Sequence, residues 1–220
     1  MEIIKQDGKY AIVKNEDRYE VRCNDEVLKT PGGKIASTLY LPIAERLMQD
    51  WKELGYSSYC EASSILCYHF TMVDNFAPLG HEAVLAMLCS MNWEKEWTLR
   101  GCPSPNPHVC MKWMTYFGNN NKVGLIRQWL VNQTVMQLVA STCVYNAFMS
   151  YNVAFFMAIV VEELPKTEHE DAIKDFYEFY SMYDPFFSFD EFWKIFDCFR
   201  VYYGIHLEED GKHLPQPEDE

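Results

Sequence analysis

Metal chemistry is the first possibility that this sequence raises, because cysteine and histidine side chains lie close together in one proline-rich stretch. Cys102, His108 and Cys110 could each bind zinc through a sulfur or an imidazole nitrogen. Structural zinc sites usually draw their ligands in tight pairs about two to four residues apart; these residues do not have that geometry, although His108 and Cys110 come closest. We therefore expect no metal and no other cofactor. The alternative hypothesis is a metal- or small-molecule-dependent enzyme that uses the Cys102–Cys110 loop.

Motifs of covalent catalysis and phosphate binding are missing from the rest of the sequence. It contains no G-x-S-x-G motif and no cysteine in a basic setting that would favour a thiolate. Gly32-Gly33-Lys34 lacks the other glycines of a phosphate-binding loop and is typical of a turn. His69, Asp74 and His81 could meet in the fold, but nothing in their spacing requires it. The sequence thus predicts a protein that is not an enzyme.

The net charge of the chain argues against certain kinds of binding partner. The chain carries 32 acidic and 19 basic residues, which gives a net charge of −13. A surface this negative repels nucleic-acid phosphates and anionic lipid headgroups. The stretch 128–161 has no charged residue, but its glutamines and asparagines would each need a hydrogen-bond partner inside a membrane, so we interpret it as core helices. We expect neither a nucleic-acid partner nor a membrane.

The eight cysteines are scattered along the chain without a C-x-x-C pair. The first ten residues also lack the apolar segment that is typical of a secretion signal. We therefore expect reduced cysteines that mostly act as small core residues. The corresponding location is the cytoplasm, or the matrix of an organelle if the source is eukaryotic.

The elements that must position any site begin with a β-rich segment. Tyr10–Val13 reads as a first strand, and the alternation of apolar residues over Tyr19–Cys23 predicts a second. Asn24-Asp25 is typical of a tight turn, after which Val27-Leu28 begins the return. Thr30–Gly33 then ends the sheet. These features predict a β-rich N-terminal domain over residues 1–41.

A single helix follows this β-rich segment. Pro42 suits its first turn, where the missing amide hydrogen costs nothing, and Gly55 is a natural stop. The apolar positions that repeat at helical spacing are Ala44, Leu47, Met48, Trp51 and Leu54. We expect this face to be buried.

The same segment follows in outline a family pattern, V-x-L-D-G-x-x-V-K-T-P-x-G-x-x-L-x-L-P with a tryptophan-bearing helix after it. The matching residues are Val21, Val27, Lys29, Thr30, Pro31, Gly33, Leu41, Pro42, Ala44 and Trp51. Asn24-Asp25 stands where the family has Asp-Gly, and Asp50 stands where it has glutamate. The stretch from Tyr19 to Gly55 therefore resembles the assembly chaperones that bind the alpha subunit of the F-type ATP synthase before it joins the catalytic hexamer.

This resemblance implies a non-enzymatic protein that binds another polypeptide, the ATP synthase alpha subunit. The motif residues to which we assign a structural role are Thr30, Pro31, Pro42 and Trp51. Towards its C-terminus the family carries an acidic helix with a Phe-Gln and a Trp-Gly, and this chain has neither. A relative that keeps the fold without this client is therefore a further hypothesis.

Helical patterns dominate the rest of the chain. The expected segments are Glu61–Phe76, Gly80–Met91, a charge-free helical stretch from Val123 onward, Glu170–Met182 and Ser188–Tyr203. We predict a helical domain over residues 42–206 and an acidic disordered tail over 207–220. The predicted fold class is thus α+β, with a small N-terminal antiparallel β domain followed by a larger, mainly α-helical domain.

An aromatic stripe marks the last of these helices, which opens with a capping box formed by Ser188 and Glu191. Two interpretations remain open. The stripe packs against the preceding helix as core, or it forms an exposed groove for a client segment. The candidate partner-binding residues are Glu178, Phe179, Phe192, Trp193 and Phe196.

Overall fold

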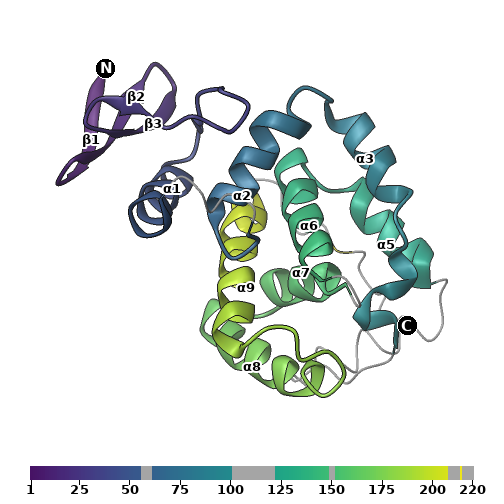
Figure 1. Ribbon diagram of the computed structural model, residues 1–220. Coiled ribbons are helices and arrows are strands. Elements are labelled where there is room, and N and C mark those ends of the chain that lie inside the picture. Colours follow the sequence, from purple (N-terminus) through teal and green to yellow (C-terminus); the bar gives the residue numbers. More distant parts are fainter. Residues whose placement is uncertain (56–60, 101–121, 149–151, 208–213, 215–220) are drawn as a thin grey trace. The chain divides into compact units, whose positions relative to one another are not determined.

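The computed structural model describes residues 1–55, 61–100, 122–148, 152–207 and 214 (Figure 1). It confirms the α+β class, with a four-stranded antiparallel sheet followed by helices. The chain divides into two compact units, Met1–Gly80 (unit 1) and His81–Glu220 (unit 2). The boundary therefore falls at Gly80 and not at residue 41. The reason is that the first helices after the sheet pack against the sheet and against each other.

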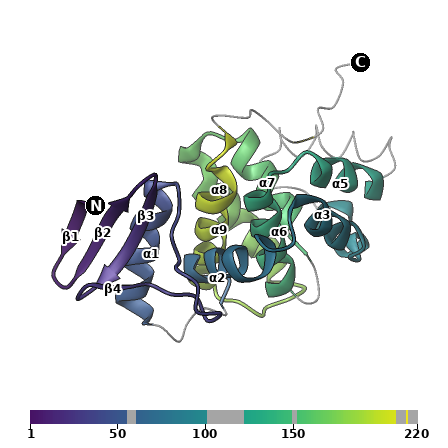
Figure 2. The ribbon, with the colours of Figure 1, turned by 90° about the horizontal axis from the view of Figure 1, so that it is seen from above.

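The sheet of unit 1 has the strand order β1-β2-β3-β4, with neighbours antiparallel (Figures 1 and 2). Its strands are β1 (Glu2–Asp7), β2 (Tyr10–Asn15), β3 (Arg18–Cys23) and β4 (Glu26–Val27). The predictions of β2 and β3 are confirmed, whereas β1 was missed. All six residues of β1 are exposed, so the strand shows none of the alternation on which the prediction relied.

A tight turn joins β3 to β4, as the sequence predicted. Asn24 and Asp25 have φ angles of 48° and 69°, which lie in the left-handed region. Two successive left-handed residues are characteristic of the type I′ hairpin turn, and asparagine and aspartate tolerate that conformation better than most residues.

Helix α1 (Leu41–Leu54) covers one side of β2 and β3. Pro42 lies in its first turn and Gly55 ends it with a φ of 70°, as expected. The buried residues are Ile43, Ala44, Leu47, Met48 and Asp50. Trp51 is only half-buried, with its ring edge-on to Tyr10 at 5.6 Å, and Leu54 is exposed. The buried face of α1 is therefore rotated about the helix axis relative to the predicted face, because the buried residues include Asp50.

Asp50 sets the start of the next helix, α2 (Ile65–Phe70). Its Oδ2 accepts hydrogen bonds from Ser64 Oγ at 2.9 Å and from the Ile65 amide at 2.7 Å. A helix at Glu61 was predicted, and it begins four residues later because Ser64 is the N-cap. The chain continues as a π-helix, η1 (Thr71–Phe76), which was not foreseen.

Unit 2 is built from helices in its described residues. They are α3 (His81–Cys89), η2 (Trp93–Lys95), η3 (Trp97–Arg100), α5 (Lys122–Val131), α6 (Val135–Ala147), α7 (Ala154–Glu163), η4 (Lys166–Glu168), α8 (His169–Tyr180) and α9 (Phe189–Gly204). Helix α9 packs against α6, α7 and α8 (Figure 2). Most residues of α6 and α7 are buried, which agrees with the interpretation of the charge-free stretch as core. Within the described residues, no helix has the length and apolarity needed to cross a membrane.

The C-terminal part differs from prediction at one residue. The tail 207–220 was expected to be disordered, but Leu214 is buried and its amide donates a hydrogen bond to Glu162 Oε2 at 3.0 Å. Residues 208–213 and 215–220 lie outside the described part of the chain. The predicted capping box of α9 is confirmed, since the side chains of Ser188 and Glu191 each bond the other's backbone amide.

Candidate functional site

The T-P-G-G motif of unit 1, Thr30–Gly33, holds two segments of the chain together. Thr30 Oγ1 donates to Asp74 Oδ1 at 2.7 Å, and the Gly32 amide donates to Asp74 Oδ2 at 2.8 Å. A Cβ atom on Gly32 would lie only 2.6 Å from Asp74 Oδ1, so the loop cannot take a side chain there without shifting this contact. The motif therefore joins the end of the sheet to η1, with one hydrogen bond to each carboxylate oxygen of Asp74.

His69 is also committed to structure. It is buried in α2, and its Nε2 lies 3.2 Å from the Ser37 carbonyl, which also accepts a hydrogen bond from Arg18. Burial lowers the pKa of His69 to about 4, so the ring is neutral at neutral pH. His69 and Asp74 thus serve separate contacts in unit 1.

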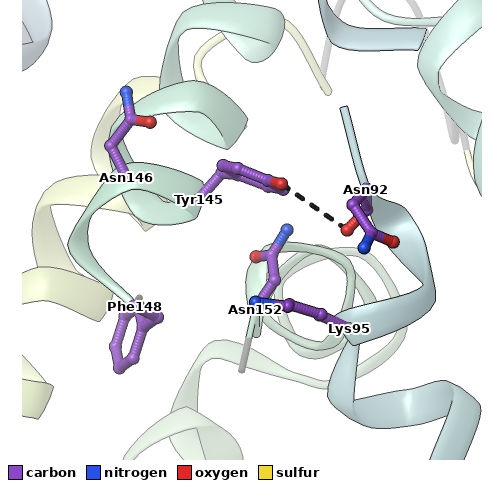
Figure 3. A pocket seen from close by; sticks show the side chains of 6 residues that line it. All are labelled: Asn92, Lys95, Tyr145, Asn146, Phe148 and Asn152. Carbon is purple, nitrogen blue, oxygen red and sulfur yellow. Dashed lines mark hydrogen bonds between the residues drawn. The ribbon is translucent and has the colours of Figure 1, made fainter. Parts of the chain in front are cut away.

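Unit 2 contains a pocket of about 290 Å³ (Figure 3). The residues that line it are Asn92, Lys95, Tyr145, Asn146, Phe148 and Asn152. They come from η2 and its N-cap, from the C-terminal end of α6, and from the residue two positions before α7. In Figure 3 the side chains of Tyr145, Lys95 and Asn152 lie toward one another, whereas those of Asn146 and Phe148 point away from them.

Asn152 is the most firmly held residue of the pocket. Its backbone amide donates to the Lys95 carbonyl at 3.2 Å, and its carbonyl accepts from the Trp97 amide at 2.8 Å. Its Oδ1 accepts from the Ala154 amide at 2.8 Å, at the start of α7. The other side-chain atom, Nδ2, has no hydrogen-bond partner among the described residues, although Asn152 is only 2% exposed. Figure 3 shows this nitrogen pointing toward the side of the pocket where Tyr145 lies.

Lys95 supplies the positive charge of the pocket. Its side chain extends toward Asn152 in Figure 3, and no described carboxylate forms an ion pair with it. Tyr145 stands across the pocket, where its hydroxyl donates to the Asn92 carbonyl at 3.5 Å and its ring contacts buried Trp93 at 5.3 Å. Among the described residues that line the pocket, Lys95 is thus the one with a charged side chain.

Glu96 lies next to Lys95 in sequence and is fully buried. Its Oε1 accepts a hydrogen bond from the Phe156 amide at 3.3 Å, in the first turn of α7. Burial raises the pKa of Glu96 to about 8, so the carboxyl is mostly protonated at neutral pH. It supports the start of α7 and is not one of the residues that line the pocket.

A second exposed feature follows α8. Met182, Tyr183 and Phe186 are 74%, 61% and 72% exposed, in the connection between α8 and α9. Together with half-buried Phe179 and Phe187 they form what we call the aromatic patch. Phe179 contacts Tyr183 with ring centroids 5.5 Å apart, and Phe186 contacts Phe187 at 4.8 Å.

The aromatic patch adjoins the pocket. The ring of Phe187 lies 5.0 Å from that of Phe148, which lines the pocket. Phe148 is itself fixed by edge contacts with Tyr180 and Phe192. An apolar path therefore leads from exposed Phe186 through Phe187 to the wall of the pocket.

The predicted partner-binding residues fall into two groups. Phe192 and Phe196 are fully buried, so their assignment to an exposed groove is wrong, and the interpretation of the stripe as core is correct for them. Their rings fill unit 2, where Phe192 packs on Phe176 at 6.0 Å. Trp193 is half-buried and contacts Phe196, whereas half-buried Phe179 belongs to the aromatic patch and exposed Glu178 precedes it in sequence.

Sequence reasoning missed the pocket and most of the patch. One signal for the patch was present: Met182-Tyr183 and Phe186-Phe187 flank Asp184-Pro185, where no helix face could bury them. No comparable signal pointed to Lys95 or Asn152, because their proximity depends on chain pairing between distant segments.

The metal alternative involves Cys102, His108 and Cys110, all of which lie outside the described residues. Within the described residues no group of three or more histidine, cysteine, aspartate or glutamate side chains could hold a metal ion. Among the described cysteines, Cys143 and Cys198 are buried, whereas Cys23, Cys67 and Cys89 are half-buried.

Comparison of the chain with protein-family models, with curated proteins and with solved structures finds no match. The assignment of function therefore depends on the geometry of the molecule and on the resemblance of residues 19–55 described above.

Proposed function

We propose that this protein binds another polypeptide and does not transform it chemically, and that the aromatic patch and the adjoining pocket are its binding surface. The observation that supports this most is the exposure of Met182, Tyr183 and Phe186, three large apolar side chains in one short connection. Contiguous exposed apolar groups are characteristic of protein interaction sites, and aromatic residues contribute much contact area for little loss of conformational freedom.

The charges around the patch favour a particular kind of partner. Glu178 precedes the patch, Asp184 lies within the connection, and exposed Asp190 and Glu191 follow at the start of α9. In a chain with a net charge of −13, this rim attracts lysine and arginine side chains. The proposed partner surface is thus an apolar segment flanked by basic residues.

The ATP synthase alpha subunit is the client that we propose. The support for it is the resemblance of residues 19–55. In this protein Thr30 of that segment donates a hydrogen bond to Asp74. A fold relative with a different client would use the same patch, so the identity of the client and the location of the surface are separate claims with separate tests.

Binding of purified alpha subunit from the source organism to immobilised protein tests both claims. We expect saturable binding that weakens as salt is added, because the acidic rim is screened. The double variant Met182→Ser/Phe186→Ser should bind at least about tenfold more weakly. The matched control is Ile3→Ser/Leu79→Ser, which removes two exposed apolar side chains from unit 1 and should bind normally.

Two results would count against the proposal in different ways. Absence of binding at low salt would exclude the alpha subunit as the client. Equal binding by the wild type and by Met182→Ser/Phe186→Ser would exclude the patch as the surface. Metal analysis of protein purified without chelator addresses the enzyme alternative, which would gain support from a stoichiometric ion.

A further inference from the structure

We propose that Glu162 is the anchor of the C-terminal tail: its carboxylate holds Leu214 on unit 2 and connects the tail to a hydrogen-bond network in the core. Glu162 and Leu214 belong neither to the aromatic patch nor to the pocket, so this role is independent of the proposed function. Three observations carry it, namely the two hydrogen bonds of Glu162, the burial of Leu214, and the place where the chain leaves α9.

The carboxylate of Glu162 lies in the last turn of α7 and accepts a hydrogen bond at each oxygen. Oε1 accepts from the hydroxyl of Tyr203, and Oε2 accepts from the Leu214 amide at 3.0 Å. A backbone amide can only donate, and so can the indole of Trp129, which donates to the Tyr203 oxygen at 3.0 Å. The proton of Tyr203 is therefore directed to Glu162.

These donors indicate that Glu162 is ionised. Burial, and after it the Glu162 carboxylate, raises the pKa of Tyr203 well above its ordinary value, so the phenol keeps its proton. A protonated carboxyl group would use one oxygen as a donor, whereas both oxygens of Glu162 accept. Hydrogen bonds to a charged acceptor are stronger than those between neutral groups. The contact with the tail is thus a charge-assisted hydrogen bond.

The network extends from the tail into the core of unit 2. Glu162 belongs to α7, Tyr203 to α9 and Trp129 to α5, and all three side chains are buried. Leu214 is therefore linked to the Trp129 indole through two intervening side chains. A change in the seating of Leu214 should be detectable at Trp129.

The side chain of Leu214 adds an apolar contribution, since the residue is only 3% exposed. Burial of a whole leucine side chain favours docking by the hydrophobic effect, which has no preferred direction. The amide bond to Glu162 supplies the direction and fixes the register of the segment. Both groups are needed for one defined position of residue 214.

The path of the chain favours its own tail as the segment that Glu162 holds. A Cβ atom on Gly204, the last residue of α9, would lie 3.6 Å from Val161, so α9 ends beside the last turn of α7. Leu207 and Leu214 are seven residues apart in sequence, and Leu214 bonds the residue that follows Val161. A connection this short gives Leu214 a high effective concentration at Glu162.

Hydrogen exchange of the full chain, followed by NMR at the amide of residue 214, tests the anchor. We expect this amide to exchange at least about a hundredfold more slowly than in an unstructured peptide of the same sequence, at every protein concentration. Slow exchange that appears only at high concentration would mean that a second copy supplies the segment.

Two variants separate the contributions of the carboxylate and the side chain. Glu162→Gln replaces one acceptor oxygen by a donor, and Leu214→Ala keeps the amide but removes most of the apolar group. Each should speed exchange at residue 214 at least about tenfold, after correction for the intrinsic rate, and should shift the indole N–H signal of Trp129. Glu168→Gln, which removes an exposed carboxylate from η4, is the matched control and should change neither signal.

Three results would overturn this role of Glu162. They are exchange at residue 214 as fast as in the unstructured peptide, protection that rises with protein concentration, and wild-type exchange in folded Glu162→Gln. Leu214→Ala changes no helical residue, so unchanged exchange in that variant overturns the anchor even if Glu162→Gln fails to fold. None of these measurements involves the alpha subunit, so their outcome is separate from that of the proposed function.

Discussion

Buried polar side chains are used differently in the two units. In unit 1, Asp50 accepts hydrogen bonds from Ser64 and Ile65, and Asp74 accepts from Thr30 and Gly32, so each carboxylate joins two segments far apart in sequence. In unit 2, Asn152 is equally well held through its backbone and Oδ1 but keeps one unpaired donor at the pocket. Buried polar groups in unit 1 hold segments of the fold together, whereas Asn152 in unit 2 keeps a buried donor without a partner among the described residues.

Apolar side chains show a parallel contrast within unit 2. Phe192 and Phe186 are six residues apart, yet the first is fully buried and the second is 72% exposed. The capping box at Ser188 starts α9 between them, so Phe192 faces the core while Phe186 stays in the connection. The contrast shows that exposure of the patch follows from where the helix begins.

The largest expected effect of a substitution on stability tests this contrast between Phe192 and Phe186. Phe192→Ala should lower the free energy of unfolding by about 4 kcal/mol, as expected for a fully buried aromatic ring, whereas Phe186→Ala should cost less than about 0.5 kcal/mol. Denaturant unfolding followed by circular dichroism gives both values. Similar losses for the two variants would show that the patch belongs to the core.

The next effect concerns the hydrogen bonds that Asp50 of α1 accepts at the start of α2. Asp50→Ala should cost about 3 kcal/mol, because it leaves the Ser64 hydroxyl, the Ile65 amide and the nearby Arg46 without their buried carboxylate. Asp50→Asn keeps one acceptor and should cost about half as much. Denaturant unfolding monitored at Trp51, with the other tryptophans replaced by phenylalanine, reports on unit 1. A decrease in the free energy of unfolding below about 1 kcal/mol for Asp50→Ala would contradict the role of Asp50 in joining α1 to α2.

The third prediction concerns pH dependence, which has opposite signs in the two units. The pKa of Glu96 is about 8 in the folded protein against 4.5 in the unfolded chain, so folded unit 2 holds an extra proton between these values and loses stability as pH rises through this range. The pKa of His69 is about 4 against 6.5, so unit 1 loses stability as pH falls from 6.5 towards 4.

Unfolding midpoints measured across this pH range test whether the stabilities of the two units change in opposite directions with pH. A Trp51→Phe background leaves only tryptophans that belong to unit 2. In that background Glu96→Gln should flatten the decline between pH 4.5 and 8, because the amide cannot ionise. A decline of unchanged slope in Glu96→Gln would assign the pH dependence to another group.

The local features of the fold were predictable, whereas the site was not. The turn at Asn24-Asp25, the ends of α1 and the capping box of α9 depend on residues close in sequence, and each was predicted. The boundary at Gly80 and the rotated face of α1 depend on contacts such as that of Asp50 with Ser64. The pocket requires Asn152 to pair with Lys95 and Trp97, and no local pattern encodes that pairing.

Site-directed photo-crosslinking to purified alpha subunit tests the central claim most directly. A photoreactive phenylalanine analogue at position 186 reports on the patch, and the same analogue at position 3, on exposed β1, reports on a surface outside it. The account predicts a crosslink to the client from position 186 that unlabelled wild-type protein competes away, and none from position 3. Crosslinking from position 3 alone would contradict it.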